Sequence, residues 1–457
     1  MLERKLFGTD GIRGKANVYP MTCDMAMNLG RAVTHYFQTH HSRRKKPLII
    51  VGKDTRLSCY MLELAFSSGV CAQGGRVVLT GPLPTPGVAF ATRSMRATAG
   101  VMISASHNSY MDNGIKIFDG EGNKLADEVE LEIEKMILSP ELIPMQDGQQ
   151  LGNAKRLDEV LGRYIVHVKG FFHNKYDLEG LKLVVDCANG AAYKVAPMIF
   201  EEMGAEVVSL GVKPNGQNIN LNCGSLHPEE ARIMVLKEKA DLGICLDGDA
   251  DRLVLIDSSG QVIDGDRLIG LFSKLLLDRK DMEKGEEVVG TVMSNLGLEL
   301  YLKDLGLNFF RAAVGDRYIW ERMVQSGSQI GGEPSGHIIL SRHSTTGDGI
   351  MGALMALMAM KHYHKPINEL VSEIEFCPQI LKNIKVKKKV PFDEIPGLGE
   401  AMKAAEKKLK DQGRILLRYS GTEDLARVMV EGRDKSLVDK ICSELVAIVT
   451  KEIGTQA

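Results

Sequence analysis

The sequence predicts an α/β protein of several domains, because short apolar strands alternate with helices along most of its 457 residues. A unit of strand, Gly-containing loop, helix, glycine and second strand occurs three times. The units are spaced by roughly a hundred residues, which is typical of repeated domains. After residue 370 the pattern changes to a strand pair followed by a terminal helix. We therefore expect three related α/β domains and a smaller α+β domain.

The predicted elements follow from apolar runs and the glycines between them. In chain order, the strand–helix–strand units are 48–52, 57–73 and 76–80; 181–186, 191–203 and 206–210; and 286–292, 297–305 and 307–311. In the last section, strands 414–418 and 427–431 bracket a polar loop, and a helix follows over 434–451. The expected domains are 1–152, 153–257, 258–370 and 371–457.

The composition is that of an ordinary globular protein and excludes several classes of function. With 57 basic and 59 acidic residues the net charge is −2, so neither nucleic acid nor a membrane surface is an expected partner. The apolar run 350–360 is far shorter than the ~20 residues that cross a bilayer, and predicts a buried helix. No apolar signal segment follows Met1, and the 8 cysteines form no C-x-x-C pair. Reduced thiols in a cytoplasmic protein are expected.

The first polar motif is 104–108 (SASHN), directly after the predicted strand 99–103. A serine that carries chemistry needs exposure at a strand end and a neighbour that handles its proton. His107 follows Ser106 directly, and Lys116 lies nearby in sequence. The alternative is an ordinary turn, in which serine and asparagine cap a following helix.

The second motif is 247–252 (DGDADR), between the predicted strands 242–246 and 253–257. Asp247, Asp249 and Asp251 repel one another when they gather, unless a cation neutralises them. A hard divalent ion such as Mg²⁺ prefers carboxylate ligands and leaves positions open for a phosphate oxygen. An EF-hand is rejected because Arg252 and Ser258 replace its sixth-position glycine and twelfth-position glutamate. The alternative is an acidic surface loop.

The third motif is 331–337 (GGEPSGH), which precedes an apolar strand. Glu333, Ser335 and His337 combine an acceptor, a hydroxyl and a ring donor, the mixture that holds sugar hydroxyls. The alternative is a simple turn.

The fourth motif is 418–423 (RYSGTE), with Arg427 on the outgoing strand. Forked arginine donors, hydroxyls and backbone amides together form a phosphate cradle. The alternative is a structural hairpin loop.

These four loops, in this order, resemble those of the α-D-phosphohexomutase superfamily over essentially the whole chain. The resemblance is closest to the branch that acts on glucosamine phosphates. It is carried by the segments 7–14 (FGTDGIRG), 103–108 (ISASHN), 112–116 (DNGIK), 290–295 (GTVMSN) and 314–318 (VGDRY).

The resemblance implies an isomerase with four domains around a central cleft, three of them α/β with mixed sheets and a C-terminal α+β domain. It implies that glucosamine 6-phosphate and glucosamine 1-phosphate are interconverted on the route to UDP-N-acetylglucosamine. A phosphoserine and a sugar 1,6-bisphosphate are the implied intermediates. One Mg²⁺ per chain and a homodimer in the cytoplasm are also expected.

The implied roles follow the motifs. The resemblance implies that Ser106 is the phosphoserine. Our candidate for the general base is Lys116, with His337 as the alternative. We expect Mg²⁺ and Arg252 to neutralise charge, and His107 and Arg13 to steady the phosphoserine. The catalytic set is Ser106, His107, Lys116, Arg13, Arg252 and His337; the metal set is Ser106, Asp247, Asp249 and Asp251. The substrate set is Glu333, Ser335, Arg418, Ser420, Gly421, Thr422 and Arg427.

Two departures from the branch bear on the sugar and phosphate loops. Pro334 replaces the usual glutamine between Glu333 and Ser335, and Asp424 replaces the usual proline after the phosphate loop. Proline removes a backbone donor and stiffens the turn. A phosphomannomutase or phosphoglucomutase therefore stays open as the alternative sugar preference. A metal-dependent phosphatase and a silent sugar-phosphate sensor are further alternatives.

Overall fold

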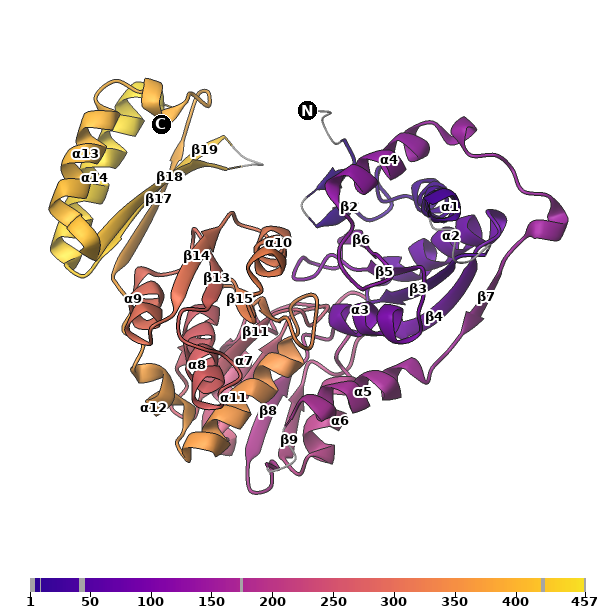
Figure 1. Cartoon of the computed structure of the whole chain (residues 1–457), viewed down its shortest axis with the longest axis horizontal. Helices are drawn as coiled ribbons and strands as arrows, with labels where there is room; N and C mark the ends of the chain where they lie inside the picture. The colour runs from indigo at the N-terminus through magenta and orange to yellow at the C-terminus, as the bar shows by residue number, and fades with distance from the viewer. Residues whose placement is uncertain (1–4, 9, 41–45, 173–175, 421–423, 456–457) are drawn as a thin grey trace.

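The computed structural model describes residues 5–8, 10–40, 46–172, 176–420 and 424–455. Four sheets follow one another along the chain, and Figure 1 shows their domains as an arc in which the first and the last form the two ends. This confirms the predicted fold class. Within the described ranges, none of the helices is both long and apolar enough to cross a membrane.

The first domain is a seven-stranded mixed sheet with the order β1-β2-β6-β5-β3-β4-β7. Its strands are β1 (Phe7–Gly8), β2 (Gly11–Lys15), β3 (Leu48–Lys53), β4 (Arg76–Pro82), β5 (Ala99–Ile103), β6 (Asp112–Phe118) and β7 (Asn153–Arg156). Its helices are α1 (Cys23–His40), α2 (Ser58–Ala72), α3 (Thr85–Ser94), α4 (Asp127–Leu138), and the 3₁₀ turns η1 (Pro140–Leu142) and η2 (Gly148–Gln150).

The second domain has the strand order β12-β11-β10-β8-β9. Its elements are α5 (Val160–Phe171), β8 (Lys182–Asp186), α6 (Val195–Glu202), β9 (Glu206–Leu210), α7 (Glu229–Glu238), β10 (Leu242–Leu246), β11 (Leu253–Asp257) and β12 (Val262–Ile263). Two strands lie just beyond the boundaries expected from the sequence. β7 pairs with β4 in the first sheet, and β12 pairs with β11 in the second.

The third domain has the strand order β14-β13-β15-β16. Its elements are α8 (Gly265–Asp278), β13 (Glu287–Thr291), α9 (Leu296–Asp304), β14 (Asn308–Ala312), α10 (Asp316–Ser326), β15 (Ile330–Gly332), β16 (Ile338–Leu340), α11 (Gly349–Tyr363) and α12 (Ile367–Ser372).

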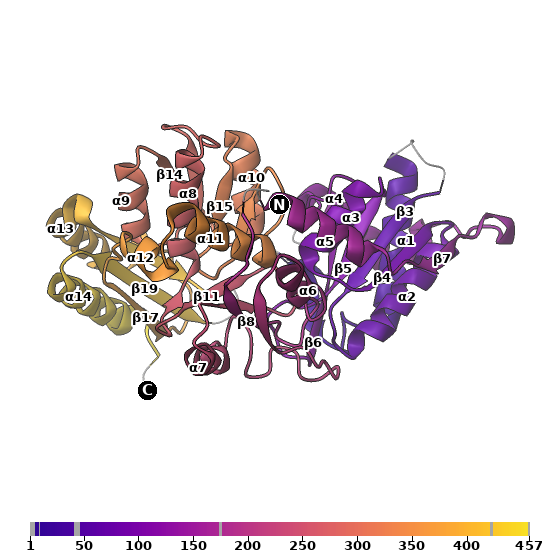
Figure 2. The same cartoon turned by 90° about the horizontal axis from the view of Figure 1, so that it is seen from below.

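The fourth domain is an antiparallel sheet with the order β17-β19-β18. Its elements are β17 (Gln379–Lys385), η3 (Phe392–Glu394), α13 (Leu398–Leu409), η4 (Lys410–Gln412), β18 (Gly413–Tyr419), β19 (Leu425–Gly432) and α14 (Lys435–Ile453). Helices α13 and α14 lie together on one side of this sheet (Figures 1 and 2).

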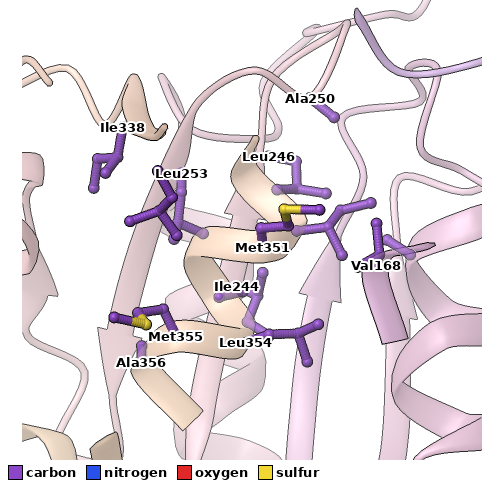
Figure 3. Close-up of a cluster of buried hydrophobic side chains, with 14 of the residues drawn as sticks. Val168, Ile244, Leu246, Ala250, Leu253, Ile338, Met351, Leu354, Met355 and Ala356 are labelled. Atoms are coloured by element: carbon purple, nitrogen blue, oxygen red, sulfur yellow. The ribbon is translucent and has the colours of Figure 1, made fainter. Parts of the chain in front are cut away.

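One hydrophobic core extends through the first three domains and includes Val78 in the first, Leu183 in the second and Leu268 in the third. Most of the buried apolar side chains of the first domain form a second cluster, drawn from residues between Leu6 and Ile143. The centre of the core that joins the three domains is α11, whose apolar run was predicted to be a buried helix, and the burial of residues 349–360 confirms that prediction. Figure 3 shows Met351 and Leu354 of α11 beside the side chains of the β10 strand. The fourth domain has a core of its own, drawn from residues between Ile384 and Ile453.

The core that joins the first three domains includes none of the described residues of the fourth, which predicts a separate thermal transition for the fourth domain. Leu354 is fully buried in the shared core and Leu445 is 1% exposed in the fourth domain. Leu→Ala at a buried site costs about 2–5 kcal/mol through lost transfer energy and the cavity that remains. We expect Leu354→Ala to lower the transition of the first three domains and Leu445→Ala to lower that of the fourth, as measured by differential scanning calorimetry. Equal shifts of one common transition by both variants would contradict this division.

Candidate active site

The loop after β5 holds Ser106 in a left-handed conformation, with φ of 52°, and buries it to 2% exposure. The next element is the strand β6, so the alternative of a serine that caps a following helix is wrong. Two side chains fix the loop by donating to the carbonyl oxygens of Ser106 and Asn108. Nη2 of Arg56 lies 3.1 and 2.6 Å from these oxygens, and Nδ2 of Asn220 lies 2.9 Å from both.

The loop after β10 gathers Asp247, Asp249 and Asp251 in the interior, with one oxygen of each within 4.8 Å of the others. Their exposure is 0, 0 and 4%, so the alternative of an acidic surface loop is wrong. Burial, with the charges of Asp251 and Asp249, raises the pKa of Asp247 to about 8. Oδ1 of Asp249 and Oδ1 of Asp251 are buried and have no hydrogen-bond partner among the described residues. A donor set of unpartnered buried carboxylate oxygens fits a hard divalent cation.

The two loops meet directly. The Ser106 hydroxyl donates to Oδ2 of Asp247 at 2.6 Å, which joins the first domain to the second. Gly248 allows this approach, because a Cβ there would lie 2.5 Å from the carbonyl oxygen of Ser106. Nδ1 of His107 lies 3.4 Å from Oγ of Ser106. Burial, with the charges of Arg252 and Arg13, lowers the pKa of His107 to about 4, so the ring is neutral near pH 7.

Lys116 extends from β6 into the carboxylate cluster and is 1% exposed. Its Nζ lies 2.9 Å from Asp249, 3.5 Å from Asp251 and 3.1 Å from Asp10. Burial alone would lower the pKa of Lys116, but these three carboxylates hold it well above its usual value. Arg13, on β2, pairs with Asp10. Lys116 is therefore protonated while its neighbours are ionised.

His337 lies at the start of the strand that leaves the sugar loop. Its Nδ1 is 3.7 Å from Asp251, and its Nε2 is 3.5 Å from Asp316 and accepts from the Gly347 amide at 3.0 Å. Burial opposes protonation, but Asp251 and Asp316 raise the pKa of His337. The two residues proposed as general base, Lys116 and His337, thus share one neighbour in Asp251.

The sugar loop is held from both sides. Glu333 accepts from the Gly315 amide at 3.1 Å and from the Ser335 hydroxyl at 3.0 Å, while Ser335 itself is exposed. Arg252 is the last residue of the motif 247–252, and its amide donates to Oδ1 of Asp247 at 3.2 Å. The pKa of the Arg252 guanidinium rises despite burial, because Asp247, Asp251 and Glu333 surround it. Arg252 therefore carries a positive charge between the metal loop and the sugar loop.

The fourth domain supplies the remaining predicted residues. Arg418 and Arg427 are register partners on β18 and β19, and burial with the charge of Arg427 lowers the pKa of Arg418. Ser420 is buried and its amide donates to the Leu425 carbonyl at 2.8 Å. Gly421 and Thr422 lie outside the described residues. In Figure 1, β18 and β19 belong to the domain at the end of the arc opposite the first domain.

Several contacts at the site were not assigned from the sequence. Thr85, at the start of α3, donates its hydroxyl to Oδ2 of Asp249 at 2.5 Å. Lys124 contacts both Asp10 and Asp316. Asp10 and Asp316 lie within the segments 7–14 and 314–318, which carry the family resemblance, so these motifs could have identified both residues as part of the site. No local pattern distinguishes Lys124 or Asn220 from other polar loop residues.

The chain matches four consecutive family models of the phosphoglucomutase/phosphomannomutases. They are alpha/beta/alpha domain I over residues 4–142, domain II over 162–260, domain III over 264–376 and the C-terminal domain over 381–448. A phosphoglucomutase/phosphomannomutase family protein from Burkholderia thailandensis has the same fold, with a TM-score of 0.81 at 22% identity, covering 98% of this chain and 99% of that one. The chain thus belongs to the phosphohexose mutases, a class of isomerases.

Full-length relatives narrow the class. The phosphoglucosamine mutase of Syntrophotalea carbinolica is 49% identical over 456 residues, which are 100% of this chain and 99% of the relative. An Aspergillus fumigatus N-acetylphosphoglucosamine mutase, solved with GlcNAc-6P and magnesium, has a TM-score of 0.67 at 18% identity over 99% of this chain and 96% of that one. The chain belongs to the phosphoglucosamine mutases of the phosphoglucomutase/phosphomannomutase family, which confirms the predicted branch.

The hydrogen bonds from Asn220 to the carbonyl oxygens of Ser106 and Asn108 can be tested by substitution. Asn220→Asp keeps the size and the left-handed preference of Asn220 but places an oxygen against two carbonyl oxygens. We expect kcat to fall at least tenfold with a Tm close to that of the parent protein. Asn218→Asp in the same loop is the matched control, since Nδ2 of Asn218 donates to the Lys213 carbonyl instead. Equal kcat values for both variants would show that the hydrogen bonds of Asn220 do not position Ser106.

Proposed function

We propose that the enzyme interconverts glucosamine 6-phosphate and glucosamine 1-phosphate through a phosphorylated Ser106. The observation that carries this proposal is the position of the Ser106 hydroxyl, 2.6 Å from the buried carboxylate Asp247 at the junction of two domains. Full-length identity of 49% to a phosphoglucosamine mutase supports the choice of sugar. The proposal also includes a cytoplasmic enzyme, a homodimer and the four domains expected from the sequence, with β7 assigned to the first domain and β12 to the second.

A resident phosphoserine answers a geometric problem, because O1 and O6 lie at opposite ends of the sugar. In the first half-reaction a sugar hydroxyl forms a bond to the phosphorus on Ser106 and the bond from phosphorus to Oγ breaks. The proton of that hydroxyl passes through a base on the protein and ends on Oγ. The product is a sugar 1,6-bisphosphate, which turns around and returns its other phosphate to Ser106 by the reverse steps.

The base is Lys116 in this proposal, with His337 as the alternative. The three neighbouring carboxylates keep Lys116 protonated, so it can act as a base only when their negative charge is reduced. Two of those neighbours, Asp249 and Asp251, are also the residues proposed to hold the cation, so their effect on Lys116 falls when the site is loaded. His107 and Arg13 would steady the phosphate on Ser106, and Arg252 would balance its charge.

Asp247, Asp249, Asp251 and the phosphate on Ser106 would hold one Mg²⁺. When bound, the ion neutralises charge on the transferring phosphoryl group, the effect on which this chemistry chiefly depends. Glu333 would accept hydrogen bonds from the sugar hydroxyls, and Ser335 would donate a hydrogen bond to them. The phosphate that does not react would be bound by the fourth domain, through Arg418, Ser420, Gly421, Thr422 and Arg427.

The function is tested by a coupled assay with Mg²⁺ and a trace of sugar 1,6-bisphosphate. Glucosamine 6-phosphate, glucose 1-phosphate and mannose 1-phosphate are compared side by side, and the parent protein is compared with Ser106→Ala. We expect kcat/KM at least tenfold higher for the glucosamine substrate, about 1.4 kcal/mol of discrimination. Ser106→Ala should lose at least a thousandfold in kcat, because it removes the hydroxyl that is proposed to carry the phosphate.

If glucose 1-phosphate or mannose 1-phosphate is the preferred substrate, the proposed mechanism still holds, and we attribute the different sugar specificity to Pro334. Full turnover by Ser106→Ala would falsify the phosphoserine route.

The metal site is tested by binding as well as by activity. We expect Mg²⁺ to raise the Tm of the parent protein and EDTA to remove both this shift and the turnover. Asp249→Asn removes a carboxylate charge that a hard cation requires, so its Mg²⁺ affinity should fall at least tenfold in calorimetric titration. Asp257→Asn is the control, because Asp257 is buried at the end of the same hairpin, outside the cluster. Equal Mg²⁺ affinities for both variants would place the cation elsewhere.

A further inference from the structure

The carboxylate cluster continues into a closed ring of side chains in which acidic and basic residues alternate. Each member contacts the next within 3.7 Å, and the ring returns to its start. In order, the contacts are Asp251–Lys116 at 3.5 Å, Lys116–Asp10 at 3.1 Å, Asp10–Lys124, Lys124–Asp316, Asp316–His337 at 3.5 Å and His337–Asp251 at 3.7 Å.

The ring joins three domains at the proposed reaction centre. Asp10, Lys116 and Lys124 belong to the first domain, Asp251 to the second, and Asp316 and His337 to the third. Its most exposed side chain, that of Asp10, is only 21% accessible, so solvent screens these charges weakly. Both groups proposed as general base are members, and each touches the same carboxylate of Asp251.

Lys124 and Asp316 touch neither Ser106 nor the metal triad directly in the described contacts, yet they close the ring. Lys124 follows the turn 119–123 that ends β6, and Asp316 is the first residue of α10. We propose that Lys124 and Asp316 are positioning residues, which together fix how far Asp10 lies from Lys116 and His337 from Asp251. Lys124 shares Asp10 with Lys116, and Asp316 shares His337 with Asp251. This inference rests on the mutase reaction proposed above.

Removal of Lys124 leaves two carboxylates without the cation between them. Asp10 keeps Lys116 and Arg13 as partners, and Asp316 keeps His337, so each carboxylate is drawn towards a group proposed to act in proton transfer. A buried charge that loses its partner reorganises its surroundings. The loss therefore reaches the reaction through Lys116 and His337, without any contact between Lys124 and substrate.

Other contacts keep the first and third domains together when the ring is opened. Arg317 pairs with Glu130 at 2.6 Å, and Nε1 of Trp320 donates to Oδ1 of Asn123 at 3.1 Å. The hydroxyl of Thr345 donates to the Gly122 carbonyl at 2.5 Å. These contacts border the same turn, so a variant at Lys124 should keep the domain interface.

The experiment compares the parent protein with Lys124→Met, Lys124→Arg, Asp316→Asn and the double variant Lys124→Met/Asp316→Asn. We expect Lys124→Met to lose at least tenfold in kcat with less than a threefold change in KM, because substrate contacts remain. Lys124→Arg should be at least threefold more active than Lys124→Met, since the charge is restored. The double variant should lose less than the product of the two single losses, because Asp316→Asn removes one of the two unpaired carboxylates.

Lys53→Met is the matched control, because Lys53 is buried in the same domain and pairs with Glu63 at 2.6 Å outside the ring. It should lower Tm while kcat stays within threefold of the parent. A kcat for Lys124→Met within threefold of the parent, or single losses that multiply exactly, would overturn the inference. If Lys124→Met does not fold, Asp316→Asn decides alone, with an expected fivefold loss in kcat. Failure of the proposed function is distinct, because the parent protein itself would then turn over no phosphohexose.

Discussion

The burial of three carboxylates at the end of β10 is the constraint on which the rest of the site depends. Uncompensated charge in the interior is costly, so Asp247, Asp249 and Asp251 need neighbours that supply a proton or a positive charge. Ser106 and Thr85 donate hydroxyls, and Lys116 supplies a cation from a neighbouring strand. These groups come from the first domain and the carboxylates from the second. The electrostatics of one loop therefore fixes how two domains meet.

The hydrophobic core supports that arrangement over a longer range. One core runs through the first three domains around α11, so the loops that bear Ser106, the triad and His337 share a common packed base. The fourth domain packs on its own core and meets the third through contacts such as Arg414 to the Ser294 carbonyl at 2.8 Å. The proposed phosphate-binding residues thus stand on a separate body, while the reacting groups stand on one continuous body.

Sequence periodicity predicted the strands closely, since buried runs such as 242–246 and 253–257 are the same in the structure. The polar loops at strand ends were also found, because each motif interrupts an apolar pattern. Pairing between distant segments could not be predicted. Lys124 and Asp316 are 192 positions apart, and no local signal couples a turn after β6 to the start of α10. The addition of β7 to the first sheet likewise depends on tertiary contacts, because all four of its residues are exposed and none has a large apolar side chain.

The surroundings of Ser106 divide into two sides of opposite charge. His107 and Lys116 are both basic, yet the pKa of His107 is lowered and that of Lys116 is raised. Burial disfavours the charged form of both, so the balance of neighbouring charges decides the difference. For His107, the effects of Arg252 and Arg13 exceed those of Asp251 and Asp249, whereas for Lys116 the effect of three carboxylates exceeds that of Arg13. The Ser106 hydroxyl lies at the boundary, 3.4 Å from His107 and 2.6 Å from Asp247. An anionic phosphate on Ser106 would therefore meet cationic arginines on one side. On the other it would face carboxylates that tolerate it only with a cation between them, which is why phosphate and metal belong to the same site.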